Sequence, residues 1–394
     1  MSNNAITVAH VSSRFQGGWR KHAYRTLAVV LGLSIAGGMA ELALRVVGYG
    51  RSYVCPFGAF HQADPVLGWR GKPNFSGRWH QGDFDVFIAL TEDGFRKLEH
   101  RKPPTEVKNT VYVLGDSFAW GWGTAQGENF ADQMNLLMPN QQVENFGLAG
   151  VGTVPEYAIF AKHVQPRLRP GDTVLLAFCS NDFFDNIDRN RVGVLHAEVR
   201  DGKVQVVQPV PGDTLTELTG KMKDWSYVFN LLAYSADRYG DHRARGGMAW
   251  HERMPLAKAA ALSPNIPDAA PEVQVTRCYL EKFKQACADR AVRLVVAYIP
   301  GQGELGEDDV SAVEDLSFPE QIGYRKAFFR CAEQLALETI DLLPHFCDAK
   351  KAKRFDRFTF RRDCHWTKDG HTVAAETIAS ILLAGNKYTL RGQH

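Results

Sequence analysis

The sequence predicts an α/β fold with a central parallel sheet of about five strands, preceded by one transmembrane helix. Two observations lead to this prediction. From residue 109 onward, short and continuously apolar segments alternate with longer helical patterns, which is typical of parallel strands covered by helices on both faces. Ahead of them, residues 26–40 contain no charged side chain, as expected for a helix that crosses a membrane.

The N-terminal segment predicts a membrane anchor with a defined orientation. Four cations stand before the apolar run, and no acidic residue occurs in the first forty positions. We therefore expect residues 1–25 to be a cytoplasmic basic arm and residues 26–47 a transmembrane signal anchor of a single-pass protein. By the positive-inside rule, everything after Arg45 is then extracytoplasmic, on the periplasmic side of the inner membrane. The cations are Arg14, Arg20, Lys21 and Arg25.

Two details of this segment bear on how it functions. A spanning helix needs about 20 residues, and the run reaches that length only when Glu41 lies at the membrane interface. Residues 38–40 (GMA) also resemble a small-residue cleavage site, so a cleaved signal peptide is the alternative to an uncleaved anchor. Either choice places the bulk of the chain outside the cytoplasm.

Composition excludes several classes of protein. The chain has 394 residues, 45% of them hydrophobic, and its 46 Lys+Arg against 44 Asp+Glu give a net charge of +2. Such a chain folds rather than remaining disordered, and the near-zero charge predicts no nucleic-acid partner. The seven cysteines include no CxxC pair, so a zinc ribbon is not expected. Cys347 and Cys364 either form a disulfide or remain free thiols.

The rest of the chain divides into two regions. Residues 48–108 contain short strand-like pieces such as 85–90 (DVFIAL) and predict a β-rich lead-in. Residues 109–394 predict the α/β domain, with an insertion at about 186–272 that carries a hairpin turning at Asp201 and Gly202. The five expected strands of the sheet are residues 111–114, 143–146, 173–178, 293–299 and 339–343.

Polar residues follow these strands at four places. The first strand leads into Gly115, Asp116 and Ser117, and the second is followed by Gly150. The carboxyl ends of parallel strands share one edge of the sheet, where open α/β folds bind their ligands. The third strand is followed by Asn181 and Asp182, and Asp363, Cys364 and His365 precede the last predicted helix.

These four motifs, in this order, resemble the SGNH (GDSL-type) hydrolase superfamily. The resemblance covers roughly residues 109–386 apart from the insertion, and it implies a flavodoxin-like three-layer α/β/α fold. It further implies that Ser117 is the nucleophile, His365 the general base and Asp363 its orienting partner. The implied oxyanion donors are the backbone N–H groups of Ser117 and Gly150 and the side chain of Asn181. No metal or other cofactor is implied.

One departure concerns the spacing of the Asp and His. The superfamily usually separates them by two residues, whereas only Cys364 intervenes here. The DxHW form resembles envelope-polysaccharide proteins that include the alginate O-acetyltransferases, although those place the Asp/His pair before the serine. Asp369 and His371 form a second candidate pair. His365 lies five residues before Gly370, as the superfamily's catalytic histidine does, so we expect His371 to serve packing.

Each motif also has a structural interpretation. Ser117 is a suitable helix N-cap, Asn181 and Asp182 suit a turn, and Asp116 suits a structural hydrogen bond. The seven cations between residues 350 and 362 are either a solvated loop or a field that attracts an anionic glycan or lipid headgroup. Trp120, Trp122 and Trp366 serve either sugar stacking or core packing.

The sequence therefore predicts a serine-dependent esterase or O-acyltransferase. Its substrate would be an O-acyl group, with acetyl the expected one, on an envelope or extracellular glycan, and the reaction would pass through an acyl-serine intermediate. Two alternatives remain: a non-catalytic glycan-binding or scaffolding subunit of an exopolysaccharide machine, and a lipase-like esterase on small or lipid esters. The expected partners are the ester substrate, the inner membrane and a polysaccharide-biosynthesis complex.

Overall fold

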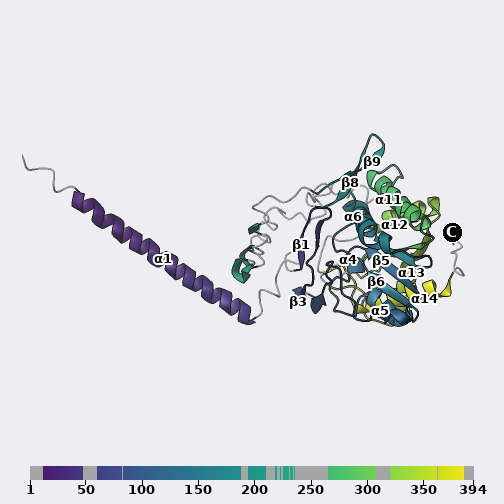
Figure 1. The fold of residues 1–394 in the computed structure, drawn as a ribbon, viewed down its shortest axis with the longest axis horizontal. Helices are drawn as coiled ribbons and strands as arrows, with labels where there is room; N and C mark the ends of the chain where they lie inside the picture. The colour runs from purple at the N-terminus through teal and green to yellow at the C-terminus, as the bar shows by residue number, and fades with distance from the viewer. Residues whose placement is uncertain are drawn as a thin grey trace, which may run out of the picture.

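The computed structural model is a layered α/β body from which one long helix projects (Figure 1). It describes residues 12–47, 60–81, 83–187, 194–209, 218–219, 222, 225–229, 231–233, 235, 265–307, 320–361 and 363–385. The first eleven residues of the expected basic arm, the start of the expected lead-in and much of the expected insertion lie outside these ranges.

The central sheet confirms the predicted fold class. Its strand order is β11-β10-β7-β5-β6, and every neighbouring pair is parallel. Numbered in chain order and taken from the β6 edge, this is the 2-1-3-4-5 arrangement of flavodoxin-like sheets, in which the connections change direction between β5 and β7. The strands are β5 (Asn109–Gly115), β6 (Gln141–Asn145), β7 (Thr173–Cys179), β10 (Arg293–Ile299) and β11 (Glu338–Asp341).

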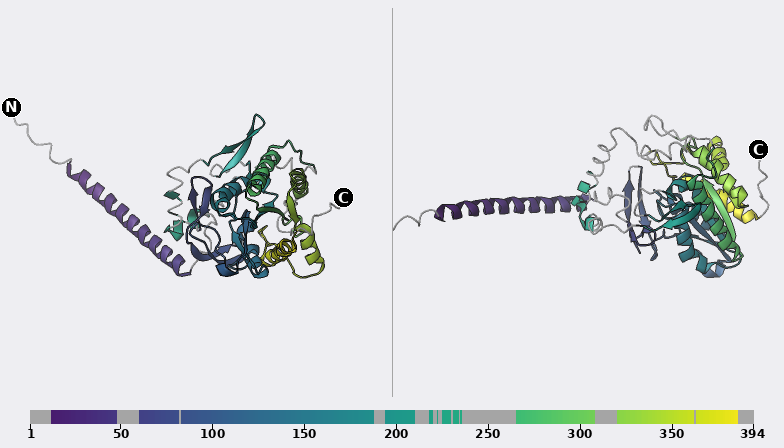
Figure 2. Two further views of the ribbon diagram at one scale, coloured as in Figure 1. Left: turned by 45° about the vertical axis from the view of Figure 1, so that its right-hand side comes forward. Right: turned by 90° about the horizontal axis from the view of Figure 1, so that it is seen from above.

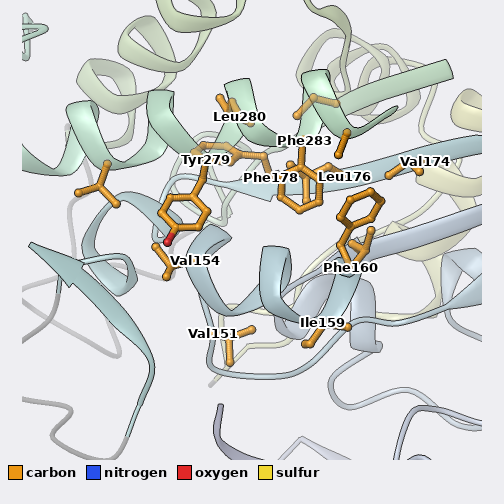
Figure 3. Close-up of a cluster of buried hydrophobic side chains, with 14 of the residues drawn as sticks. Val151, Val154, Ile159, Phe160, Val174, Leu176, Phe178, Tyr279, Leu280 and Phe283 are labelled. Carbon is orange, nitrogen blue, oxygen red and sulfur yellow. The ribbon is translucent and has the colours of Figure 1, made fainter. Parts of the chain in front are cut away.

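Alternate residues of each strand pack into two separate hydrophobic layers, because successive side chains of a strand point to opposite faces of the sheet. On β7, Val174, Leu176 and Phe178 pack into one layer with helices α6 (Thr153–Ile159) and α11 (Pro271–Ala288) (Figure 3). Helix α12 (Glu320–Gln334) contributes to the same layer. Leu175 and Ala177 pack into the other layer, with helices α5, α13 and α14. The continuous apolar run of β7 is thus explained by burial on both sides.

Short helices follow the strands, and longer ones cover the sheet. The described α-helices of the domain are α4 (Ser117–Trp120), α5 (Phe130–Leu137), α6 (Thr153–Ile159), α7 (Asp182–Asp185), α11 (Pro271–Ala288), α12 (Glu320–Gln334), α13 (Leu343–Lys351) and α14 (Lys368–Ala384). A π-helix (Phe160–Val164) and 3-10 helices (Pro104–Glu106, Gln165–Arg167) complete the set.

The segment ahead of the sheet forms two antiparallel pairs. β1 (His61–Asp64) pairs with β2 (Gly68–Gly71), and β3 (Ser76–Gln81) pairs with β4 (Phe84–Ala89). An aromatic cluster joins this segment to the start of the α/β domain: Phe60 stacks on Trp120 at 5.2 Å between ring centroids, and Trp79 lies 4.6 Å from Trp122. The two hairpins therefore pack directly against the residues that follow β5.

The insertion begins with the expected hairpin. β8 (His196–Arg200) pairs antiparallel with β9 (Lys203–Val207). Asp201 and Gly202 connect them with φ angles of +50° and +71°, and this left-handed pair suits the twist of a two-residue hairpin.

The projecting helix is α1 (Ser12–Val47). Its part from Trp19 to Val47 has 29 residues, contains an 18-residue stretch with a mean hydropathy of 2.0, and that stretch is not buried in the protein. By length and composition this part is able to cross a membrane, and a signal sequence would have the same character. The helix begins before residue 26 and so includes part of the expected basic arm.

The cysteines show no disulfide among the described residues. Cys347 and Cys364 are both free thiols, as are Cys179, Cys278, Cys287 and Cys331. Cys55 lies outside the described part of the chain.

Candidate active site

Ser117 stands at the end of β5, where the chain turns sharply into α4. Gly115 permits this turn, because its φ is +148° and a Cβ there would lie 2.7 Å from the carbonyl oxygen of Ala177. Asp116, rather than Ser117, caps α4: its carboxylate accepts a hydrogen bond from the Phe118 N–H at 2.9 Å. The hydroxyl of Ser117 is therefore not used as the helix cap.

The Ser117 hydroxyl is instead hydrogen-bonded to His365. Ser117 Oγ lies 2.7 Å from His365 Nε2, and His365 Nδ1 is bonded to the Oδ1 of Asp363. The same Asp363 oxygen also accepts a hydrogen bond from the His365 backbone N–H at 2.9 Å. One intervening residue is thus enough for the aspartate to hold both the ring and the backbone of the histidine.

The loop that carries Asp363 and His365 is held in place by hydrogen bonds to a glutamate. The Glu307 carboxylate accepts hydrogen bonds from the backbone N–H groups of Phe358 and Thr359, at 2.9 and 2.8 Å, and from the Thr359 hydroxyl at 2.8 Å. The buried indole of Trp366 donates to the Pro300 carbonyl at 3.2 Å. These contacts join the loop to the residues that follow β10.

Trp122 is a site residue whose role the sequence did not reveal. Its indole Nε1 donates to Asp363 Oδ2 at 3.0 Å, and its ring centroid lies 5.4 Å from that of His365. Trp122 is 6% exposed, so its ring is engaged in packing rather than presented for sugar stacking. A tryptophan five residues after the GDS serine was the available signal, but nothing local connected it to Asp363.

Asp363 is held as a carboxylate by these partners. Burial raises the pKa of Asp363, but the charge and hydrogen bonds of His365, with the Trp122 N–H, bring that pKa below its usual value. The side chains of His365 and Asp363 are 18% and 14% exposed. The imidazole is therefore partly shielded yet accessible from solvent.

Asn181 reaches the residue next to Ser117. It follows β7, and its Nδ2 donates to Asp116 Oδ2 at 3.1 Å and to Asp185 Oδ2 at 3.0 Å. Both amide hydrogens are thus directed at carboxylates. Gly150 lies in the loop between β6 and α6 with a φ of +75°, a conformation that favours glycine.

Buried acids lie around this amide. Asp116, Glu156 and Asp182 are fully buried, and Asp185 is 8% exposed. Burial raises the pKa of Asp116 to about 6, against the opposing effect of its bonds to Phe118 and Asn181. Burial and the neighbouring acids raise the pKa values of Glu156 and Asp182 well above their usual range. The sequence predicted a turn role for Asp182, and its Oδ2 accepts a hydrogen bond from the Cys179 N–H at 3.1 Å.

His371 lies apart from the Ser117 hydroxyl and packs in the core. It is fully buried, its Nδ1 accepts a hydrogen bond from the Phe130 N–H at 3.3 Å, and its ring stacks with that of Phe130. Burial lowers the pKa of His371 to about 3, so the ring is neutral at physiological pH.

Four of the cations between residues 350 and 361 are engaged by the protein itself. Lys350 donates to the Leu305 carbonyl at 2.7 Å, Lys351 pairs with Asp348 and Arg354 pairs with Glu376. Arg357 donates to the Thr359 carbonyl at 2.9 Å. These contacts favour a structural role over an open patch of free charge.

Among the described residues, one group of potential metal ligands is close enough together to be considered as a metal site. The ligand atoms of Asp363, Cys364 and His365 lie within 4.8 Å of one another. Both ring nitrogens of His365 are already bonded, however, and a structural zinc site normally has four protein ligands. The group fits a hydrogen-bonded triad better than a metal centre.

One family model matches the C-terminal third of the chain. The family model of the SGNH hydrolase-like domain of acetyltransferase AlgX matches residues 261–394, a region that holds Asp363 and His365 but not Ser117. No curated protein matches the chain significantly.

Solved structures similar to the chain include a lipolytic protein of the G-D-S-L family from Veillonella parvula. It is 10% identical over 70% of this chain and 98% of its own, with a TM-score of 0.36. The acetylxylan esterase Axe2 from Geobacillus stearothermophilus is 12% identical over 73% of this chain and 98% of its own, with a TM-score of 0.37. The family-model match shows that residues 261–394 are similar to an SGNH hydrolase-like domain, and the parallel sheet has the flavodoxin-like strand order.

Proposed function

We propose that the protein is a serine-dependent esterase or O-acyltransferase that acts on O-acyl groups, with acetyl the expected one, of an envelope or extracellular glycan. The observation that carries the proposal is the continuous hydrogen-bonded chain from Ser117 Oγ through His365 to Asp363. A serine hydroxyl is a weak nucleophile until a neighbouring base takes its proton, and this chain provides that base.

In the proposed reaction, Ser117 Oγ attacks the acyl carbonyl while His365 Nε2 takes the hydroxyl proton. The tetrahedral intermediate collapses as His365 returns the proton to the leaving sugar oxygen, which leaves the acyl group on Ser117. Water or a second sugar hydroxyl then attacks the acyl-serine, with His365 again acting as the base. Asp363 keeps the imidazole oriented and stabilises its protonated form without taking the proton.

Three groups are proposed as oxyanion donors. The Ser117 N–H lies at the N-terminus of α4, and the Gly150 N–H and the Asn181 amide would complete the set. A donor of this kind is typically worth about 2.7 to 4 kcal/mol of transition-state stabilisation. Because the hydrogens of Asn181 Nδ2 point at Asp116 and Asp185, an oxyanion would share or displace one of these bonds.

The glycan substrate and the location are the finer parts of the proposal. The match to an acetyltransferase family model supports acyl-ester chemistry generally. The apolar helix α1 supports attachment to the inner membrane, with the catalytic domain on the periplasmic side. An enzyme in that place meets acylated polymers of the envelope.

Covalent labelling tests the nucleophile. We expect a fluorophosphonate probe to label the full-length protein at Ser117 and to leave Ser117→Ala unlabelled. Ser180→Ala, a buried serine next to Asn181, is the matched control and should label like the wild type. Absence of labelling in a folded wild-type protein would contradict the proposal and favour a non-catalytic, glycan-binding subunit.

Product analysis then separates the two reaction types. An acetylated chromogenic donor is incubated with and without an oligosaccharide acceptor. Acetyl transfer to the acceptor, at the expense of free acetate, identifies an acyltransferase, whereas release of acetate that the acceptor does not change identifies an esterase.

A further inference from the structure

Glu41 of α1 binds a segment that is far away in the sequence. Its carboxylate accepts hydrogen bonds from the Ser226 hydroxyl at 2.9 Å and from the backbone N–H groups of Tyr227 and Val228, both at 3.0 Å. Ser226 in turn caps the short helical stretch that follows, because its Oγ accepts from the Phe229 N–H at 3.1 Å. A carboxylate at the start of a helical turn is favourable, since the free N–H groups there attract an anion.

Arg45, one turn further along α1, binds the same segment. Its guanidinium donates to the Trp225 carbonyl at 2.8 Å and lies over the Tyr227 ring, 4.9 Å from the ring centroid. It also pairs with Glu41 at 2.7 Å. In both views of Figure 2 the described part of this segment lies beside the C-terminal end of α1. An acid and a base within the last two turns of an apolar helix are thus used to hold part of the insertion.

The depth of this contact follows from the length of α1. Between Arg25 and Arg45 lie 19 residues, among which Glu41 is the one charged side chain, and they span about 28 Å at 1.5 Å per residue. The hydrocarbon core of a bilayer is about 30 Å thick. The last turns of α1, with Glu41 and Arg45, therefore extend to the headgroup level on the side of the catalytic domain, where charged side chains are tolerated.

The docked segment exposes large apolar side chains at this level. Trp225 is 78% exposed, and Leu218, Met222 and Leu232 are 52%, 41% and 63% exposed. Leu218, Met222 and Trp225 follow one another at intervals of four and three residues, the spacing of side chains on one face of a helix. Tryptophan and leucine on one side of a short helix are typical of elements that lie in a membrane interface.

We propose that Leu218, Met222, Trp225 and Leu232 belong to an interfacial element that Glu41 and Arg45 hold against the membrane, with these apolar side chains inserted at the headgroup level. The occupant of this apolar face is the lipid surface, because the face is continuous with the end of a helix suited to span the bilayer. This inference rests on the proposed membrane attachment of α1. Its consequence is that the catalytic domain is held to the bilayer at two points rather than swinging on a single anchor.

The test follows the fluorescence of Trp225 in the full-length protein. Wild type and Trp225→Phe are reconstituted in vesicles of phosphatidylcholine and phosphatidylglycerol, either unmodified or brominated near the headgroup end of the acyl chains. The emission of Trp225 is obtained by subtracting the emission of Trp225→Phe from that of the wild type. We expect brominated lipid to quench this difference by about two-fold or more, as for a side chain buried in the headgroup and acyl boundary, and aqueous iodide to have little effect.

Removing the anchor of the segment should reverse this result. In Glu41→Ala, the Trp225 emission should become less sensitive to brominated lipid and more accessible to iodide. Glu281→Ala, which removes an exposed acid of α11, is the matched control and should behave like the wild type.

The outcomes separate this inference from the attachment on which it rests. Resistance of the protein to extraction with alkaline carbonate reports on α1 alone. A protein that resists extraction but whose Trp225 is quenched by iodide and not by brominated lipid would overturn the interfacial element while leaving the anchor intact. A protein released by carbonate would instead refute the attachment itself. Quenching by neither agent would indicate that a protein partner covers the face, which also contradicts the proposal.

Discussion

The indole N–H of Trp122 donates a hydrogen bond to the Oδ2 of Asp363 at 3.0 Å, although the two residues are 241 positions apart. The other oxygen of the same carboxylate binds His365. Trp122 follows the first strand of the sheet and Asp363 precedes the last helix, so this bond connects the two ends of the α/β domain at the site. It also fixes the rotation of the carboxylate toward the imidazole.

The first prediction concerns this bond. Trp122→Phe keeps an aromatic ring but removes the donor, and a hydrogen bond to a charged group is worth about 1.5 to 3 kcal/mol. We expect kcat to fall by about ten- to a hundredfold, with KM little changed because Trp122 is almost fully buried and its indole N–H is directed at Asp363. Trp120→Phe is the control: the Trp120 indole N–H is buried without a partner among the described residues, so its loss should cost far less. Equal losses in both variants would assign Trp122 to packing alone.

A second prediction decides between the two histidines. His365→Ala should lose nearly all fluorophosphonate labelling of Ser117, because the base that activates the hydroxyl is gone. His371→Asn should keep most of the labelling, since an asparagine oxygen is able to replace Nδ1 as the acceptor for the Phe130 N–H. Asp363→Asn should fall between the two. A greater loss at His371 would transfer the role of base to the pair Asp369 and His371.

The third prediction concerns the oxyanion donors. Asn181→Ala should leave the protein folded and reduce turnover by about 10² to 10³, the usual loss for one such donor. Turnover is measured with the acetylated chromogenic ester, and circular dichroism checks the fold. Unchanged turnover would mean that Asn181 serves only to bridge Asp116 and Asp185.

The fourth prediction concerns stability against pH. The pKa of His371 is lowered from 6.5 to about 3 in the folded protein by burial, so the unfolded chain binds a proton between these values and the folded protein does not. The neutral ring of His371 therefore makes its full contribution to the free energy of unfolding above about pH 6.5. This contribution is lost as the pH falls, by at most about 1.4 kcal/mol per pH unit.

His371→Asn removes this proton uptake. The melting temperature of the wild type in detergent should fall more between pH 7 and pH 5 than that of the variant. Asp116 changes the stability with pH in the opposite direction, because its raised pKa makes the folded protein, not the unfolded chain, bind the extra proton. Asp116 is present in both proteins, so its effect cancels in the comparison. A wild type and a variant with the same pH dependence would contradict the assignment of His371 as a buried neutral ring.

The fifth prediction concerns topology. Four cations precede the apolar run of α1, so a reporter fused after residue 60 should be active only when it requires export. Activity of a cytoplasm-dependent reporter at that position would refute the proposed orientation.

Local patterns in the sequence determined the sheet and the arrangement of its motifs. The apolar runs of β5 and β7 were recognisable because both faces of these strands are buried, and the hairpin at Asp201 and Gly202 was recognisable from its turn residues. Residues that follow parallel strands meet at one edge for geometric reasons alone. The sequence therefore predicted that Ser117 and Asn181 would lie at the same edge of the sheet.

Tertiary structure alone decided the contacts between distant segments. Asp116 and Ser117 are both suitable helix caps, and only the packed geometry shows that the aspartate takes the cap while the serine hydroxyl meets His365. The sequence predicted only that Glu41 lies at the membrane interface, and its hydrogen-bond partners, 185 and more positions away, are evident from the structure alone. Contacts such as these depend on how whole elements pack against one another, and no periodicity, spacing or turn signal within a single segment encodes them.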